Sequence, residues 1–310
     1  MTRVVFLLTP QLHLLDLAGP AQVFSTATGL GHDYQLGYLA EQEDVLSSQG
    51  LPLRAEVRRP NLTPDDLILV PGWRAPTLAG PSNPSRAAGN GWLSAESLSW
   101  LFDHHAGGGT VASVCAGADA LGRAGLLDGR RCTTHHDVQD ELAQRYPRAS
   151  VVRDVLYVVD DRVATSAGIA SGIDLALHLL AVRHGPGVAA QVARQMVVFG
   201  RRNGHEPQVS VMLRHRSHLS DTVHRVQDLI DSHFTEPLPL AALAAAAKVS
   251  ERTLTRLFET ATGCTPLRYQ QLLRVERAEH LVGQGETLET AARAVGFGDA
   301  RMLRRLRART

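Results

Sequence analysis

Cys115 stands at an abrupt change in the sequence, where an apolar run gives way to small residues. Residues 110–114 predict a buried strand, and Ala116 and Gly117 are small enough to permit a tight turn into a helix. A cysteine on such a turn is presented as a nucleophile, and the start of the helix is expected to lower the pKa of its thiol. A buried structural cysteine accounts for the same local sequence equally well. The residues therefore leave a reactive thiol and a packed thiol as equal alternatives.

The cysteines as a set predict neither a disulfide framework nor a metal site. Cys115, Cys132 and Cys264 are far apart and odd in number, and no CxxC pair is present. We therefore expect a reducing, cytoplasmic environment, no metal and no cofactor. No apolar run approaches the ~18 residues of a membrane span. The apolar run at residues 4–8 is too short for a signal peptide, so a membrane is not an expected partner.

Arginine and threonine side chains gather on the outer faces of two short predicted helices near the end of the chain. Ser250 is suited to cap the first helix, because its hydroxyl can accept a backbone N–H, and Asp299 can cap the second. Each helix follows a tight turn and another short helix, which is a helix-turn-helix arrangement. Arginine and threonine in this position read base edges in a major groove. The candidate DNA-binding residues are Ser250, Arg252, Thr255, Arg256, Arg301, Arg304 and Arg305.

The formal net charge of +1 conceals two oppositely charged parts. Residues 211–310 carry 15 Lys+Arg against 11 Asp+Glu, and residues 1–210 carry 17 against 20. A basic end is a weak indication of nucleic-acid binding, and the solvated face of an ordinary helical domain is the alternative. Because the turn pattern occurs twice, we favour double-stranded DNA as the partner of this end.

The elements that must position these residues divide the chain into two parts. The first alternates apolar runs with amphipathic stretches, which predicts an α/β domain with a parallel sheet flanked by helices. The second has apolar residues at helical spacings and is predicted to be all-helical. The predicted strands are residues 3–8, 34–40, 67–70, 110–114, 155–159 and 163–165. The predicted helices are residues 18–28, 92–105, 116–124, 171–183, 191–199, 223–234, 240–247, 250–260, 266–282 and 287–295, together with the short helix that Asp299 caps.

The domain boundaries follow from this change of pattern. We expect an α/β domain over residues 1–190, a linker over 191–215 and a helical domain over 216–310. Residues 73–91 are rich in Gly, Pro and Ser, which predicts a lid or a disordered loop.

The helical part resembles the DNA-binding domain of the AraC family. The matching residues are Leu243, Ala244, Val249, Ser250, Leu254, Leu257, Phe258, Thr262, Gly263, Pro266, Tyr269, Arg274, Arg277, Ala278, Leu281, Ala291, Val295, Gly296, Phe297, Gly298 and Asp299. The resemblance implies two helix-turn-helix units that are joined by a rigid helix and enter adjacent major grooves. The chain ends before the family's final helix, and Arg307 stands where the family has a core aromatic residue. We therefore expect either that the second recognition helix is frayed or that the chain is truncated, and that the first unit dominates DNA affinity.

The first part resembles the ThiJ/PfpI superfamily, which has the glutamine-amidotransferase-like fold. The matching residues are Leu15 to Pro20, Val23, Phe24, Leu69 to Gly72, Ser113 to Gly117, Leu121, Ala124 to Arg131, Thr133 to His135, Thr165 to Gly168 and Gly172 to Leu175. Its fusion to an AraC-type domain resembles the GlxA-like regulators. In this resemblance Asp16 faces the elbow cysteine. The residues expected to line a ligand site are Asp16, Gly72, Cys115, Ala116 and His135.

Catalytic relatives carry a threonine or a histidine directly after the cysteine, where this chain has Ala116. We therefore expect no enzymatic activity, with Asp16 and Cys115 as vestigial catalytic or sensing residues. The predicted function is a sequence-specific transcription regulator. Its first domain would sense a small-molecule effector or form a homodimer. The alternatives are a cysteine-dependent, hydratase-like enzyme and a thiol redox sensor, each with an accessory helical domain.

Overall fold

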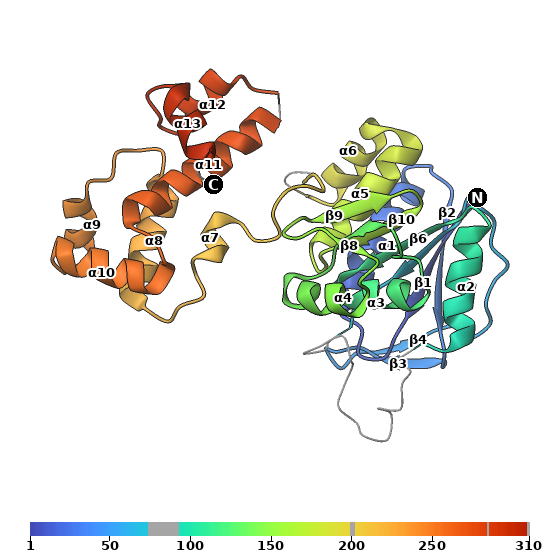
Figure 1. The fold of residues 1–310 in the computed structure, drawn as a ribbon. Coiled ribbons are helices and arrows are strands. Elements are labelled where there is room, and N and C mark those ends of the chain that lie inside the picture. Colours follow the sequence, from blue (N-terminus) through green and yellow to red (C-terminus); the bar gives the residue numbers. More distant parts are fainter. Residues whose placement is uncertain (74–92, 199–201, 284, 309–310) are drawn as a thin grey trace, which may run out of the picture. The chain divides into compact units, whose positions relative to one another are not determined.

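The computed structural model describes residues 1–73, 93–198, 202–283 and 285–308, and the chain forms two compact units, Met1–Gln208 and Val209–Thr310 (Figure 1). The division between the units falls inside the stretch 191–215 that the sequence predicts to be a linker. The predicted lid or loop at 73–91 lies, apart from Trp73, outside the described residues. Across the described ranges, no helix has both the length and the apolar character needed to cross a membrane.

The first unit is built on a six-stranded sheet with the order β2-β1-β5-β6-β10-β9 (Figure 1). All neighbouring strands are parallel except β9, which forms an antiparallel hairpin with β10. Strands β1, β5 and β6 are buried along almost their whole length, which explains their continuous apolar runs. The strands are β1 (Thr2–Leu8), β2 (Tyr34–Ala40), β5 (Leu67–Val70), β6 (Thr110–Val114), β9 (Tyr157–Asp160) and β10 (Val163–Ser166). The predicted fold class is confirmed.

Helices cover both faces of this sheet. The connection from β1 to β2 and the connection from β5 to β6 run in opposite directions along the strand order. Because such crossovers are right-handed, their helices α1 and α2 fall on opposite faces. Helix α1 packs with α5 and α6, and α2 packs with α3. The helices are α1 (Leu14–Gly29), α2 (Ala95–Ala106), α3 (Ala118–Arg123), α4 (Gln139–Arg145), α5 (Ser171–His184) and α6 (Pro186–Gln195).

Several short elements escape prediction, and one helix is placed wrongly. The sequence predicts a helix over 191–199, whereas α6 spans Pro186–Gln195. Gly185, with a φ of +90°, ends α5, and Pro186 starts α6, where a missing N–H does no harm. The unpredicted elements include α4, the helix α7 (Val211–Arg214), and the two-stranded pairs β3 (Asp44–Leu46) with β4 (Pro52–Arg54) and β7 (Arg131–Cys132) with β8 (Ser150–Val151).

The second unit is all-helical within its described residues, as predicted, and has two apolar cores. The first core includes Phe258 and Tyr269, and the second includes Ala291 and Leu303. Helix α11 contributes to both cores, so it joins the two helix-turn-helix units. The helices are α7 (Val211–Arg214), α8 (Asp221–His233), α9 (Leu240–Ala247), α10 (Glu251–Thr262), α11 (Pro266–Gly283), α12 (Leu288–Ala294) and α13 (Ala300–Arg307).

Candidate functional site

Cys115 lies at the sharp turn between β6 and α3. Its backbone φ is +55°, in the left-handed region that residues other than glycine rarely adopt. A single 3-10 turn, Cys115–Gly117, follows the strand at once and leads into α3. This is the strained strand-to-helix geometry of a nucleophile elbow.

Two glycines set the space around the Cys115 side chain. A Cβ atom on Gly72 would lie 2.6 Å from the Cys115 Cβ and 2.7 Å from Asp16 Oδ2. A Cβ atom on Gly168, whose φ is +102°, would lie 2.3 Å from the Cys115 Cβ and 2.9 Å from its Sγ. Neither position tolerates a side chain without movement of the elbow. Gly72 is among the predicted site residues. Gly168 is not, although it closes one of the matching sequence motifs.

Asp16, on α1, is fully buried beside this cysteine. Its Oδ1 accepts the backbone N–H of Ile169 at 2.6 Å, and its Oδ2 lies toward Gly72 and Cys115. Burial raises the pKa of Asp16 from 3.8 to about 6, against the opposing effect of the Ile169 hydrogen bond. The structure therefore brings together Asp16, Gly72 and Cys115, as the sequence predicts.

The thiol of Cys115 does not have the lowered pKa that the elbow position predicts. Burial and the negative charge of Asp16 raise the pKa of Cys115 well above its usual range, and a backbone hydrogen bond from Ala116 offsets only part of this effect. The helix that follows is short, and its N-terminal effect is smaller than the loss of hydration. Of the two alternatives that the sequence leaves open, the packed thiol fits this raised pKa better than the reactive thiol does.

Thr134 belongs to the site, although the sequence alone does not predict it as a site residue. Its hydroxyl donates to the Cys115 carbonyl oxygen at 2.7 Å. A residue that is not part of the turn thus holds the backbone of the elbow in place. Its own carbonyl oxygen accepts from Gln139 Nε2 at 3.2 Å and from Gln208 Nε2 at 2.9 Å. Its place in the Thr133–His135 motif was the available signal, but only long-range contacts reveal its role.

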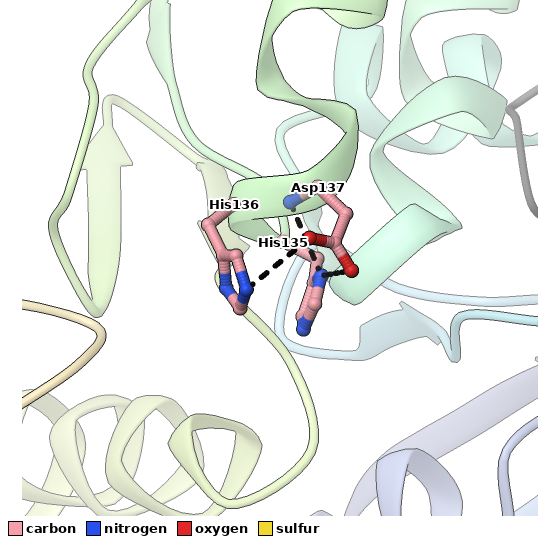
Figure 2. Close-up of side chains that lie close together, drawn as sticks. All are labelled: His135, His136 and Asp137. Atoms are coloured by element: carbon pink, nitrogen blue, oxygen red, sulfur yellow. Dashed lines mark hydrogen bonds and ion pairs between the residues drawn. The ribbon is translucent and has the colours of Figure 1, made fainter. Parts of the chain in front are cut away.

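His135 follows Thr134 directly, and its ring contacts Asp137 and His136 (Figure 2). Burial and the neighbouring His136 lower the pKa of His135, which favours its neutral form. His136 and Asp137 are more exposed. One potential ligand atom from each of these two residues and one from His135 all lie within 4.8 Å of one another. A ligand role for His135 stays a prediction.

The candidate DNA-binding residues lie on two capped helices. The Ser250 hydroxyl accepts the Thr253 N–H at 3.2 Å and so caps α10 as predicted. Arg252 and Arg256 are exposed on this helix. The Thr255 hydroxyl donates to the Glu251 carbonyl oxygen at 2.9 Å, which leaves its acceptor lone pairs and methyl group for a partner.

The second helix, α13, is capped by Asp299, which accepts from the N–H groups of Arg301 and Met302. Arg301, Arg304 and Arg305 are exposed. However, Arg304 forms an ion pair with Glu289 at 3.0 Å, and Arg305 Nη2 donates to the Met302 sulfur at 2.9 Å. The side chains of Arg304 and Arg305 are therefore more engaged within the chain than those of Arg252 and Arg256 on α10.

The structure corrects the expectation of a frayed second recognition helix. Helix α13 is formed over Ala300–Arg307, and its buried side chains are those of Ala300, Leu303 and Leu306. Arg307 is exposed and pairs with Glu279 at 3.1 Å. Helical periodicity turns Leu306 inward in place of residue 307, so no arginine has to be buried.

Arg274, on α11, ties the two helix-turn-helix units together. Its guanidinium donates to the carbonyl oxygens of Phe234 (2.5 Å), Glu236 (2.8 Å) and Gly296 (2.9 Å). It also lies 5.6 Å from the centre of the Phe297 ring. These contacts join the residues that follow α8 to the turn between α12 and α13, which fixes that turn against the first helical core.

Comparison with known proteins separates the chain into the same two parts. Residues 2–182 match the model of the DJ-1/PfpI family, and residues 243–310 match that of a helix-turn-helix domain. A solved structure, an AraC family transcriptional regulator from Pseudomonas putida, superposes with a TM-score of 0.53 at 26% identity, covering 63% of this chain and 100% of that one.

Curated relatives include regulators and an enzyme. The HTH-type transcriptional regulator CdhR of Pseudomonas aeruginosa is 30% identical over 282 residues, which are 90% of this chain and 80% of CdhR. Isonitrile hydratase of Pseudomonas putida is 34% identical over 183 residues, which are 57% of this chain and 70% of the hydratase. The similarity to the regulator thus extends over most of the chain, and that to the enzyme over little more than half.

Proposed function

The chain belongs to the DJ-1/PfpI family and carries a helix-turn-helix domain, and from this combination we infer that it is a DNA-binding transcription regulator. The observation that carries the inference is the pair of capped helices, α10 and α13, held on the common helix α11. Two exposed, arginine-bearing helices on one rigid support fit adjacent major grooves. Because a transcription regulator needs access to DNA, we propose that the protein is cytoplasmic.

A mobility-shift assay with the DNA upstream of its own gene tests this function. We expect a shift that weakens steeply with salt, because arginine–phosphate contacts release counterions. A random fragment of equal length is the control for sequence specificity. Equal affinity for both fragments, or no shift at low salt, would contradict the proposal.

The elbow is the proposed sensing site of the first unit. Asp16 and Cys115 lie side by side there, packed against Gly72 and Gly168, and the raised pKa of Cys115 argues against a thiolate nucleophile. We propose that a small polar molecule binds at this site. A thermal-shift screen of small metabolites against the native chain tests this, with Asp16→Asn as the matched variant. A molecule that stabilises the native chain and Asp16→Asn equally would bind at a site other than the elbow.

A series of hydrogen bonds supports a route for the signal out of the site. Thr134 bonds to the Cys115 carbonyl on one side and accepts from Gln208 on the other. Gln208 is the last residue of the first unit, and its backbone N–H also donates to Asp154 Oδ1 at 3.0 Å. A shift of the elbow would therefore reach the point where the chain leaves this unit. In a reporter strain, Gln208→Ala should alter the response to a hit from the screen while the ligand still binds.

The arginine- and glycine-bearing segment just before Gln208 is also bound firmly to the first unit. Arg202 donates to the buried Asp174 at 2.6 and 3.0 Å, and Gly204 accepts from the backbone N–H of Leu156 at 2.8 Å. The exit segment is thus part of the α/β unit, which supports its role as the transmitting element.

We propose a homodimer as the working form, on the basis of the resemblance to GlxA-like regulators. Dimerisation through the first unit would bring two pairs of helix-turn-helix units to one promoter. Sedimentation equilibrium at micromolar concentration tests this. A monomer at concentrations that saturate the DNA would contradict it.

Hydratase activity is the second candidate, because an isonitrile hydratase is 34% identical over 183 residues. The buried Cys115 with its raised pKa and the Ala116 that follows it argue against turnover. We propose that the chain is not an enzyme. Incubation with an isonitrile, followed by detection of the hydrated product, tests this. Turnover by the native chain that disappears in Cys115→Ser would reverse the proposal.

A further inference from the structure

Three consecutive side chains, those of His135, His136 and Asp137, converge next to Thr134 (Figure 2). His135 Nδ1 lies 3.5 Å from Asp137 Oδ2, and His136 Nε2 lies 3.3 Å from Asp137 Oδ1. Figure 2 shows the carboxylate facing both imidazole rings. The side chains are 24%, 50% and 74% exposed, respectively, so ions from solution reach them.

One ligand atom from each of the three residues lies within 4.8 Å of the other two, and each histidine nitrogen lies 3.3–3.5 Å from a different oxygen of the same carboxylate. Two ligands at ~2.0–2.1 Å from a tetrahedral centre lie about 3.4 Å apart. Imidazole nitrogens with a single carboxylate suit Zn²⁺, Ni²⁺ and Cu²⁺, whereas Mg²⁺ prefers oxygen ligands. We propose that His135, His136 and Asp137 bind a divalent transition-metal ion. Three protein ligands leave one position open for water or a small ligand.

His135 Nδ1 is available in the form that a metal requires. The backbone N–H of Asp137 donates to His135 Nδ1 at 3.4 Å, so this nitrogen carries a lone pair. The bond is long and therefore weak, and an ion can replace it. The rings of His135 and His136 have their centres 4.1 Å apart and are inclined by 33°, so both imidazoles are already side by side.

The backbone that carries these ligands is held in place before any ion binds. The short 3-10 helix His136–Val138 orients the consecutive side chains. The preceding residue, Thr134, is fixed by its bonds to Cys115, Gln139 and Gln208. Little conformational freedom is lost on binding, which favours affinity. Cysteine spacing does not predict this site, because its ligands are two histidines and an aspartate.

Isothermal titration of the full chain, without a histidine tag, with ZnCl₂ tests the proposal. We expect one Zn²⁺ per chain and no binding of Mg²⁺ at the same concentration. His136→Ala and Asp137→Asn should each weaken binding at least ~10-fold, since loss of an outer-shell contact alone has that effect. His205→Ala removes an exposed histidine outside the cluster and should leave the Kd unchanged.

Co²⁺ in place of Zn²⁺ separates this site from a cysteine site. We expect a visible d–d spectrum without the charge-transfer band of a thiolate ligand. Both variants change partly exposed side chains, and thermal unfolding without metal checks that they fold. The proposal is overturned by a failure to bind Zn²⁺, by a thiolate band, or by unchanged affinity in both variants.

Discussion

The elbow and the recognition helices hold their functional side chains in opposite ways. At the elbow, Asp16 and Cys115 are buried, and residues distant in the sequence, such as Ile169 and Thr134, fix them. On α10, by contrast, Arg252 and Arg256 are exposed, and a cap within one turn sets the start of their helix.

This difference predicts where a mutation is felt. A change at the elbow disturbs packed backbone, so it acts on the stability of the first unit before it acts on any ligand. A change on a recognition helix leaves the fold intact and acts on the partner. The following experiments test this contrast, from the largest expected effect to the smallest.

Gly168→Ala should cause the largest loss of stability. The added Cβ would meet the Cys115 Cβ at 2.3 Å on a backbone with positive φ, and we expect a loss of about 3–5 kcal/mol. Gly185→Ala is the matched control, because Gly185 has a φ of +90° but open space around it, so backbone strain of about 1–3 kcal/mol acts alone. Urea unfolding followed by tryptophan fluorescence reports on this unit, since all three tryptophans precede residue 209. Equal losses in the two variants would show that the elbow is loosely packed.

Asp16→Asn should change how stability depends on pH. The pKa of Asp16 is about 6 in the folded chain against 3.8 as the ordinary value. Between these values the unfolded chain loses the proton first, so rising pH removes up to about 3 kcal/mol of stability from the native protein. The variant has no such proton. The difference in unfolding free energy between native and variant should therefore fall as the pH rises from about 4 to about 7. A constant difference would mean that the Asp16 pKa is not raised.

Arg256→Ala should weaken DNA binding by about 1–3 kcal/mol without a loss of fold. Arg305→Ala should weaken it less, because the Arg305 guanidinium already bonds to Met302 and the first unit is expected to dominate. The control for a general loss of positive charge is Arg225→Ala, because Arg225 is exposed on α8, outside the recognition helices. Fluorescence anisotropy with a labelled operator at fixed salt measures all three affinities. A larger loss of DNA affinity for Arg305→Ala than for Arg256→Ala would contradict the expectation that the first helix-turn-helix unit dominates binding.

The same contrast decides what could be predicted from the sequence. Strand β6, helix α9 and the Ser250 cap follow from apolar periodicity and from local hydrogen bonding, which nearby residues determine. The meeting of Asp16 and Cys115 follows from a family resemblance, since they are 99 positions apart in the chain.

The raised pKa of Cys115 and the roles of Gly168 and Thr134 do not follow from local sequence. They depend on burial and on contacts between segments brought together only by folding. Arg307 shows the same limit in the helical unit. A shift of one position along α13 exchanges the buried Leu306 for the exposed Arg307. Alignment to a family pattern does not determine which of the two positions faces the core.

Arg307→Ala should have the smallest effect. Both partners of the Arg307–Glu279 pair are about half exposed, so its loss should cost less than ~1 kcal/mol. Leu306→Ala, one position earlier, empties a buried site and should cost about 2–5 kcal/mol. Hydrogen–deuterium exchange of the peptide that spans α13 measures both effects locally, with strong acceleration expected only for Leu306→Ala. If both substitutions accelerated exchange equally, Arg307 would contribute to the core as the family pattern implies, and its exposed pairing with Glu279 would not describe the folded unit.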